Sequence, residues 1–149
     1  MTSEDYLPGL EAVLSIDPGI TTGWAVISEG AIVGTGIFHV DDLESGLDTL
    51  VRGMHRAGYS LTVVIEEMPR GGRMSQLSAR LEQIRQTLGK VLADTFELVI
   101  YYVTPGAWKP SRVGRQFKMP QEFGGKPLVI HQKDAIRMGY YFIDKKGQE

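Results

Sequence analysis

The sequence predicts one α/β domain with a mixed five-stranded sheet flanked by helices, and the order of its apolar segments leads to this fold class. Three apolar stretches separated by short turns come first, and two more then alternate with helical patterns. Strands joined by short turns pair antiparallel, whereas strands joined through a helix run parallel in one sheet. At 149 residues with 42% hydrophobic content, the chain can bury one core, so a single domain over 1–149 is expected.

The first three strands are predicted at residues 13–17, 23–27 and 32–38 and form an antiparallel meander. A Ser-Glu-Gly turn at residues 28–30 separates the last two strands and is typical of a hairpin. Residues 1–11 precede the strands without the apolar core of a secretory signal, and they are expected to form a flexible tail.

The rest of the chain alternates helices with two strands, of which the first is expected to be buried on both faces. A helix is predicted from Asp41 or Asp42 to Gly58, because its apolar residues recur every three or four positions. The other regular elements are expected to be strands at 61–65 and 98–103 and helices at 74–93 and 129–143. Residues 105–127 contain four prolines and four glycines and are predicted to lack regular structure.

Acidic and basic residues are divided unequally along the chain, although the net charge is only −2. Up to Glu67 there are eleven acidic and two basic residues, whereas from Met68 onward there are seven acidic and fourteen basic residues. The asymmetry favours a basic surface for a polyanion and a set of acids that bind a cation; an ordinary solvated surface is the alternative.

The composition also excludes several classes of protein. The chain has no cysteine, which excludes disulfides and thiolate metal sites, and it has no run of about 18 apolar residues that would predict a membrane span. Because no export signal is recognisable, a cytoplasmic protein without membrane contact is expected.

Carboxylates end two of the strands that are predicted to be buried. Asp17 closes the first strand, and Glu66 follows the fourth. Asp134 lies on the last helix three residues after His131, so these two side chains share one helix face. Clustered carboxylates repel one another unless a cation lies among them, and oxygen ligands suit Mg²⁺ or Mn²⁺. Beside a basic surface the cluster indicates metal-assisted phosphodiester hydrolysis, whereas each acid alone is more typical of a turn or a solvated strand end.

Four short stretches carry these residues: IDPG at 16–19, TGWAV at 22–26, VIEE at 64–67 and HQKDA at 131–135. In this order they resemble the motifs of RuvC-type Holliday junction resolvases, which are homodimeric nucleases of the RNase H-like superfamily. The resemblance covers residues 13–143, nearly the whole chain. It implies an RNase H-like fold and a structure-selective endonuclease that cuts four-way (Holliday) or branched DNA junctions as a homodimer.

The resemblance also implies roles for individual residues. Its catalytic residues, which are also the ligands of two Mg²⁺ ions, would be Asp17, Glu66, His131 and Asp134. Mn²⁺ is expected to substitute for Mg²⁺, and members of the family carry either Asp or His at the position of His131. Glu67 is a weaker candidate, because neighbouring residues of a strand point to opposite faces.

Two departures from the family pattern concern the DNA-binding surface. Bacterial members tend to have an aromatic residue three positions after the catalytic glutamate, where this chain has Pro69 in a basic, glycine-rich loop. A lysine-bearing helix is expected before the last motif, where this chain has the segment 105–127. That segment is closer to phage-encoded members, whose proteins would act in the host cytoplasm. The predicted DNA contacts are the basic residues of the two segments: Arg70, Arg73, Lys109, Arg112, Arg115 and Lys118.

Two other functions are compatible with parts of this pattern. An actin-like ATPase also places an aspartate-bearing strand before a glycine-rich hairpin, but it usually has two such hairpins in a much longer chain. A catalytically silent nucleic-acid-binding module would keep the fold without cleavage, although all the expected ligand positions are filled here. Trp108 is expected either to face DNA with the neighbouring basic residues or to cap the core.

Overall fold

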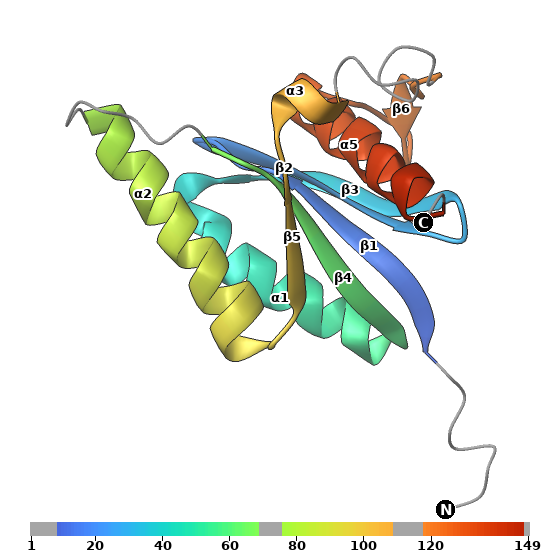
Figure 1. Cartoon of the computed structure of the whole chain (residues 1–149), viewed down its shortest axis with the longest axis horizontal. Helices are drawn as coiled ribbons and strands as arrows, with labels where there is room; N and C mark the ends of the chain where they lie inside the picture. Colours follow the sequence, from blue (N-terminus) through green and yellow to red (C-terminus); the bar gives the residue numbers. More distant parts are fainter. Residues whose placement is uncertain (1–8, 69–75, 109–117, 148–149) are drawn as a thin grey trace, which may run out of the picture.

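The computed structural model describes residues 9–68, 76–108 and 118–147. Within them, five strands form a mixed sheet in the order β3-β2-β1-β4-β5, with an antiparallel meander over the first three (Figure 1). β4 runs parallel to β1, and β5 runs parallel to β4. The strands span Leu10–Asp17 (β1), Thr21–Ser28 (β2), Ala31–His39 (β3), Tyr59–Glu66 (β4) and Val99–Val103 (β5). The predicted fold class is therefore confirmed.

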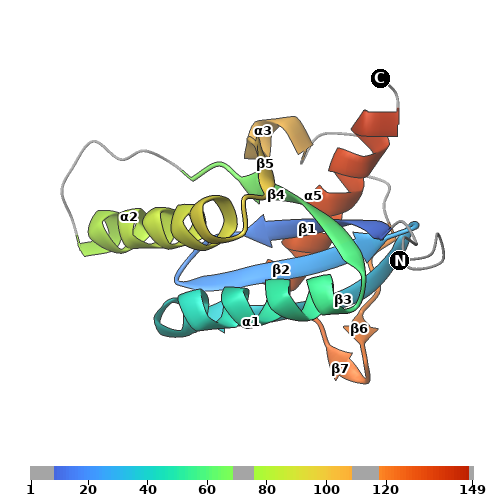
Figure 2. The ribbon, with the colours of Figure 1, turned by 90° about the horizontal axis from the view of Figure 1, so that it is seen from below.

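Helices cover both faces of the sheet (Figure 2). The larger apolar core lies on the face of α1 and α2, and a smaller one lies under α5 on the other face. A short turn, Val40–Asp42 (η2), precedes α1, and a π-helical segment, Gly89–Thr95 (η3), continues α2. The α-helices span Leu43–Arg56 (α1), Gln76–Leu88 (α2), Pro105–Trp108 (α3) and Ile130–Gly147 (α5). None of the helices in the described part of the chain is long and apolar enough to cross a membrane.

Two glycines let α5 approach the sheet closely. A Cβ atom at Gly139 would lie 2.7 Å from Cδ1 of Ile27, and one at Gly23 would collide with the backbone carbonyl of His131. Real Cβ atoms do not come this close to other atoms, so a larger residue at Gly23 would displace the backbone of α5, and one at Gly139 would force the Ile27 side chain to shift. These glycines therefore fix the position of the helix that carries His131 and Asp134.

β1 begins earlier than the sequence predicts, which shortens the expected N-terminal tail. Leu10 pairs with Tyr59 in the parallel register, and its N–H donates to the carbonyl of Gly58 at 3.0 Å. Leu10 and Glu11 are thus part of the sheet, because pairing with β4 extends past the apolar stretch at 13–17. Residues 1–8 lie outside the described part of the chain.

Two helical predictions are corrected in a similar way. The single helix expected at 74–93 is α2 followed by η3, and at its end the N–H of Phe96 donates to the carbonyl of Val91, five residues back, at 3.2 Å. Apolar periodicity does not distinguish this wider winding from an α-helix. The final helix runs to Gly147, beyond the expected end at 143.

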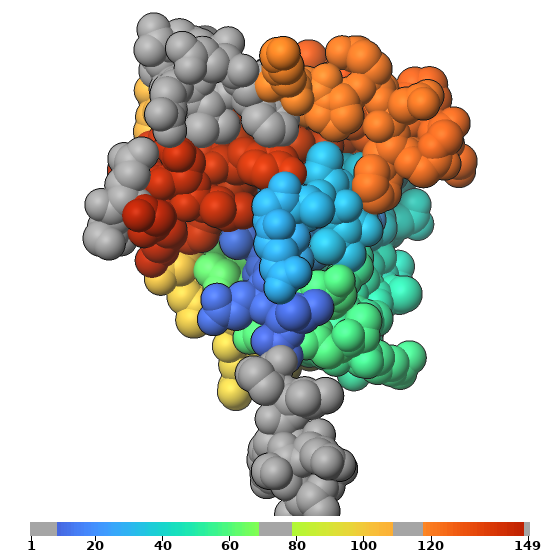
Figure 3. All heavy atoms as spheres, turned by 90° about the vertical axis from the view of Figure 1, so that its right-hand side faces the viewer, coloured from blue at the N-terminus to red at the C-terminus, as the bar shows by residue number. Residues whose placement is uncertain are grey.

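The segment 105–127 contains regular structure where none is predicted. α3 opens it, and the two-residue strands Glu122–Phe123 (β6) and Lys126–Pro127 (β7) form a hairpin near its end. Gly124 and Gly125 have φ angles of 61° and 80°, which a two-residue hairpin turn requires. The glycines that indicate a loop in the sequence therefore close a hairpin. Its segment (orange) lies beside α5 (red) and the β2–β3 hairpin (light blue) in Figure 3.

Candidate active site

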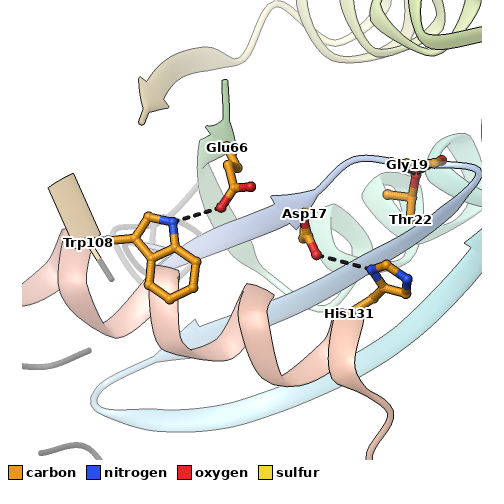
Figure 4. A network of polar contacts seen from close by, with 6 residues as sticks. All are labelled: Asp17, Gly19, Thr22, Glu66, Trp108 and His131. Carbon is orange, nitrogen blue, oxygen red and sulfur yellow. Dashed lines mark hydrogen bonds and ion pairs between the residues drawn. The ribbon is translucent and has the colours of Figure 1, made fainter. Parts of the chain in front are cut away.

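The carboxylates of Asp17 and Glu66 lie at the same edge of the sheet. Each ends its strand, and Ile16 pairs with Ile65 in the parallel register between β1 and β4. Strand alternation turns both acids toward the face that α5 covers, as Figure 4 shows. Asp17 is only 9% exposed, so β1 holds a carboxylate at the border of the core.

The Pro-Gly turn after β1 is closed by a threonine and not by the aspartate. The Gly19 N–H donates to Oγ1 of Thr22 at 3.3 Å, and the Thr22 hydroxyl donates to the Gly19 carbonyl at 3.1 Å. Among the described residues, the Asp17 carboxylate has a hydrogen bond to His131 and none to this turn. The common interpretation of an aspartate before Pro-Gly as a turn residue therefore does not hold here.

His131 lies on the first turn of α5 and faces Asp17. Its Nδ1 atom is 3.2 Å from Oδ2 of Asp17, although the two residues are 114 positions apart in the sequence. An ionised carboxylate only accepts hydrogen bonds, so this contact with a charged Asp17 requires a proton on Nδ1 of His131. In the neutral tautomer with that proton, Nε2 can accept a proton or bind a cation.

Glu66 has a separate partner, the indole of Trp108 on α3. The indole N–H donates to Oε2 of Glu66 at 2.7 Å, and Trp108 is only 1% exposed (Figure 4). Of the two positions expected for Trp108, the structure supports the buried one. The sequence did not indicate its hydrogen bond, because nothing local links a tryptophan after the fifth strand to a glutamate after the fourth.

Burial and neighbouring charges raise the pKa of Asp17 from 3.8 to about 6. The largest cause is burial, which penalises the charged carboxylate; the negative charges of Glu66 and Asp134 act in the same direction. The hydrogen bond from His131 lowers the pKa and offsets part of this effect. The charges of Glu66 and Asp134 therefore act on Asp17 at this edge of the sheet.

The side chains at this site are of the types that bind a hard divalent cation, although they are not arranged around a common point. Within residues 9–68, 76–108 and 118–147, no group of three or more His, Asp or Glu side chains is arranged to hold a metal ion. Asp17 is engaged with His131 and Glu66 with Trp108, while Asp134 lies one helical turn beyond His131. Carboxylate oxygens and one imidazole are ligands that suit Mg²⁺ or Mn²⁺.

An open hollow gives access to this edge of the sheet. Its volume is about 620 Å³, and Pro18, Glu66 and Thr104 lie on its wall. Of the predicted DNA contacts, Lys118 is described and exposed. The others lie outside the described residues: Arg70, Arg73, Lys109, Arg112 and Arg115.

The mixed five-stranded sheet flanked by helices has the RNase H-like fold. Among solved structures, the chain resembles RuvC of Thermus thermophilus, with a TM-score of 0.65, 16% identity and coverage of 91% of this chain and 96% of that one. It also resembles T. thermophilus RuvC in complex with Holliday junction substrate, with a TM-score of 0.66, 16% identity and coverage of 92% and 96%. No protein-family model and no curated protein sequence matches the chain. The fold is thus RuvC-like.

Proposed function

We propose that this protein is a divalent-metal-dependent endonuclease that resolves four-way or branched DNA junctions as a homodimer. The single observation that carries the proposal is the meeting of Asp17, Glu66 and His131 at one sheet edge, with Asp134 coupled to Asp17 through its charge. The RuvC-like fold over most of the chain and the bound junction in one RuvC structure support the choice of substrate.

Each residue has a distinct part in the proposed mechanism. Asp17, Glu66 and Asp134, together with His131, would hold two Mg²⁺ ions; when bound, these supply charge neutralisation and Lewis-acid activation at the scissile phosphate. Trp108 holds one oxygen of Glu66 in place and leaves its other oxygen for the cation. With Nδ1 of His131 held by Asp17, Nε2 has one of two parts: it would bind one of the cations, or, without a cation on it, it would accept a proton from the attacking water.

The decisive test compares three activities in Mg²⁺: cleavage of a radiolabelled immobile four-way junction, cleavage of a linear duplex and hydrolysis of ATP. Selective cutting of the junction supports the proposal. Hydrolysis of ATP without cutting would favour an actin-like ATPase, and junction binding without cutting in either Mg²⁺ or Mn²⁺ would favour a silent binding module. Sedimentation of the protein with and without junction tests the homodimer.

Replacement of Trp108 by Phe is expected to lower the cleavage rate by about tenfold or more, because a hydrogen bond to a charged group is lost. Phe keeps most of the buried ring, so junction binding in chelator should change little. The matched control is Trp24→Phe, since the indole N–H of Trp24 is buried without a partner among the described residues. Equal rates for the two variants would contradict the assigned role of Trp108.

At His131, Ala is expected to remove most of the activity, whereas Asp should retain part of it. A carboxylate can replace the nitrogen ligand, but a methyl group can neither bind a cation nor accept a proton. Single-turnover cleavage with saturating Mg²⁺ measures both variants. If His131→Ala cuts junctions at the rate of the wild type at every pH tested, the histidine has no part in catalysis.

Junction binding is expected to weaken steeply with salt through the predicted basic residues. Replacing Arg70 and Arg73 together by Ala should flatten the slope of log affinity against log salt by up to about two units, since each phosphate contact contributes about 0.9 on duplex DNA. Anisotropy titrations at several salt concentrations give the slope. An unchanged slope would exclude this loop from the DNA interface.

A further inference from the structure

A groove with aromatic and basic walls lies between β5 and the C-terminal half of α5. We call it the aromatic–lysine groove; its defining residues are Tyr101, Tyr141, Phe142, Lys145 and Lys146. Its volume is about 420 Å³, and its lining comes from β5, α3 and the C-terminal part of α5. None of the residues assigned to the proposed active site lines it.

The groove pairs positive charge with aromatic surface. The Lys146 ammonium lies 4.4 Å from the centre of the Tyr101 ring and donates to its hydroxyl at 3.3 Å, while that of Lys145 lies 5.9 Å from the Tyr141 ring. No carboxylate is among the described residues of the lining. The acids Glu11 and Glu29 line the adjoining hollow over β1 instead.

One end of the groove reaches the candidate active site. Thr104 lines both the groove and the open hollow against Glu66. Ala107 lines the groove as well, and the next residue, Trp108, donates the hydrogen bond to Glu66. A chain of phosphates held near Glu66 can therefore continue into the groove without leaving the protein surface.

We propose that the aromatic–lysine groove binds an unpaired nucleic-acid strand that continues from the candidate active site. Lys145 and Lys146 contact its phosphates, and Tyr101 stacks against one of its bases. Tyr101 is 37% exposed and faces α5, where it packs against Phe142 and Lys146. An unpaired strand fits better than duplex, because aromatic side chains stack on bases that are not already stacked in a helix. The inference rests on the proposed nuclease function.

The test measures binding of a fluorescent oligothymidylate and of a blunt duplex of equal length to the full chain in chelator. Lys145→Gln/Lys146→Gln is expected to weaken strand binding by about tenfold and to flatten its salt slope by about 1.4 units. Tyr101→Leu should weaken strand binding by about fivefold or more with an unchanged slope. The matched control is Arg56→Gln/Lys90→Gln, which removes the same charge from α1 and η3 on the opposite face. Circular dichroism verifies that each variant is folded.

The possible outcomes separate this inference from its alternatives. Selective loss of strand binding in the groove variants supports it. Equal losses for strand and duplex, or losses no larger than those of the control, overturn it. If the groove variants lose self-association in sedimentation while they keep strand binding, the groove is an interface between copies of this chain and the inference is wrong. If strand binding follows the expectation but no variant and no wild-type protein cuts junctions, the proposed nuclease function fails and the groove assignment holds.

Discussion

Asp17→Asn is expected to abolish junction cleavage, with a loss in rate of about three orders of magnitude or more. The amide keeps the size of the side chain and can still accept a hydrogen bond from His131, but it removes the charge that binds the cation. Several kcal/mol of transition-state stabilisation by metal ions are lost with it, and each 1.36 kcal/mol is tenfold in rate. Single-turnover cleavage in Mg²⁺ measures the loss.

The same result is expected for Glu66→Gln and Asp134→Asn, with junction binding in chelator largely intact for all three variants. Glu67→Gln is the matched control, because it removes an equal charge from an exposed side chain next to Glu66. It should cut at close to the rate of the wild type. Near-normal cleavage by one of the three variants would show that this acid is not a ligand.

In the absence of divalent cations, Asp17→Asn is also expected to stabilise the fold at pH 8. The pKa of Asp17 is about 6 in the folded protein and near 3.8 when unfolded, so the folded state binds the proton more tightly. Stability from this group is therefore highest below pH 3.8 and is lost as the pH rises toward 6. At 1.36 kcal/mol per pKa unit, the charged carboxylate costs up to about 3 kcal/mol at pH 8.

Thermal unfolding in chelator measures this cost. For a chain of this length, Asp17→Asn should raise Tm at pH 8 by up to about 6–12 °C, and its advantage should disappear near pH 4. Asp94→Asn, at an exposed acid, should change Tm little at either pH. Added Mg²⁺ should raise Tm of the wild type more than that of Asp17→Asn, since it neutralises the buried charge. A variant that is less stable than the wild type at pH 8 would contradict the assigned electrostatics.

The strands of the central sheet could be predicted because each coincides with a mostly apolar stretch, although β5 at the edge of the sheet leaves Val99 and Tyr102 exposed. The stretches at 61–65 and 98–103 are apolar enough to be recognised alone, and β4 and β5 lie there. Element ends were less predictable. β1 extends to Leu10 because its backbone pairs with β4, and backbone pairing does not depend on the side chain.

Glycines and prolines were the least reliable indicators of secondary structure. In the segment 105–127 they predicted irregular structure, but Gly124 and Gly125 form the turn of a hairpin, and Pro105 begins α3. A proline is tolerated in the first turn of a helix, where its missing N–H has no helical partner. The same residue types thus break one element and begin another, depending on their position.

The sequence by itself determined which acids end which strands, because an acid after an apolar stretch is a local pattern. It therefore identified Asp17 and Glu66, and the spacing of three residues placed His131 and Asp134 on one helix face. Only the tertiary structure decided which side chain meets which: His131 bonds Asp17 across 114 positions, and Trp108 bonds Glu66 across 42. The pKa of Asp17 follows from the same long-range packing, since burial and the charges of distant residues set it. Contacts of this kind depend on how α3 and α5 dock on the sheet, and no short segment of the chain encodes that docking.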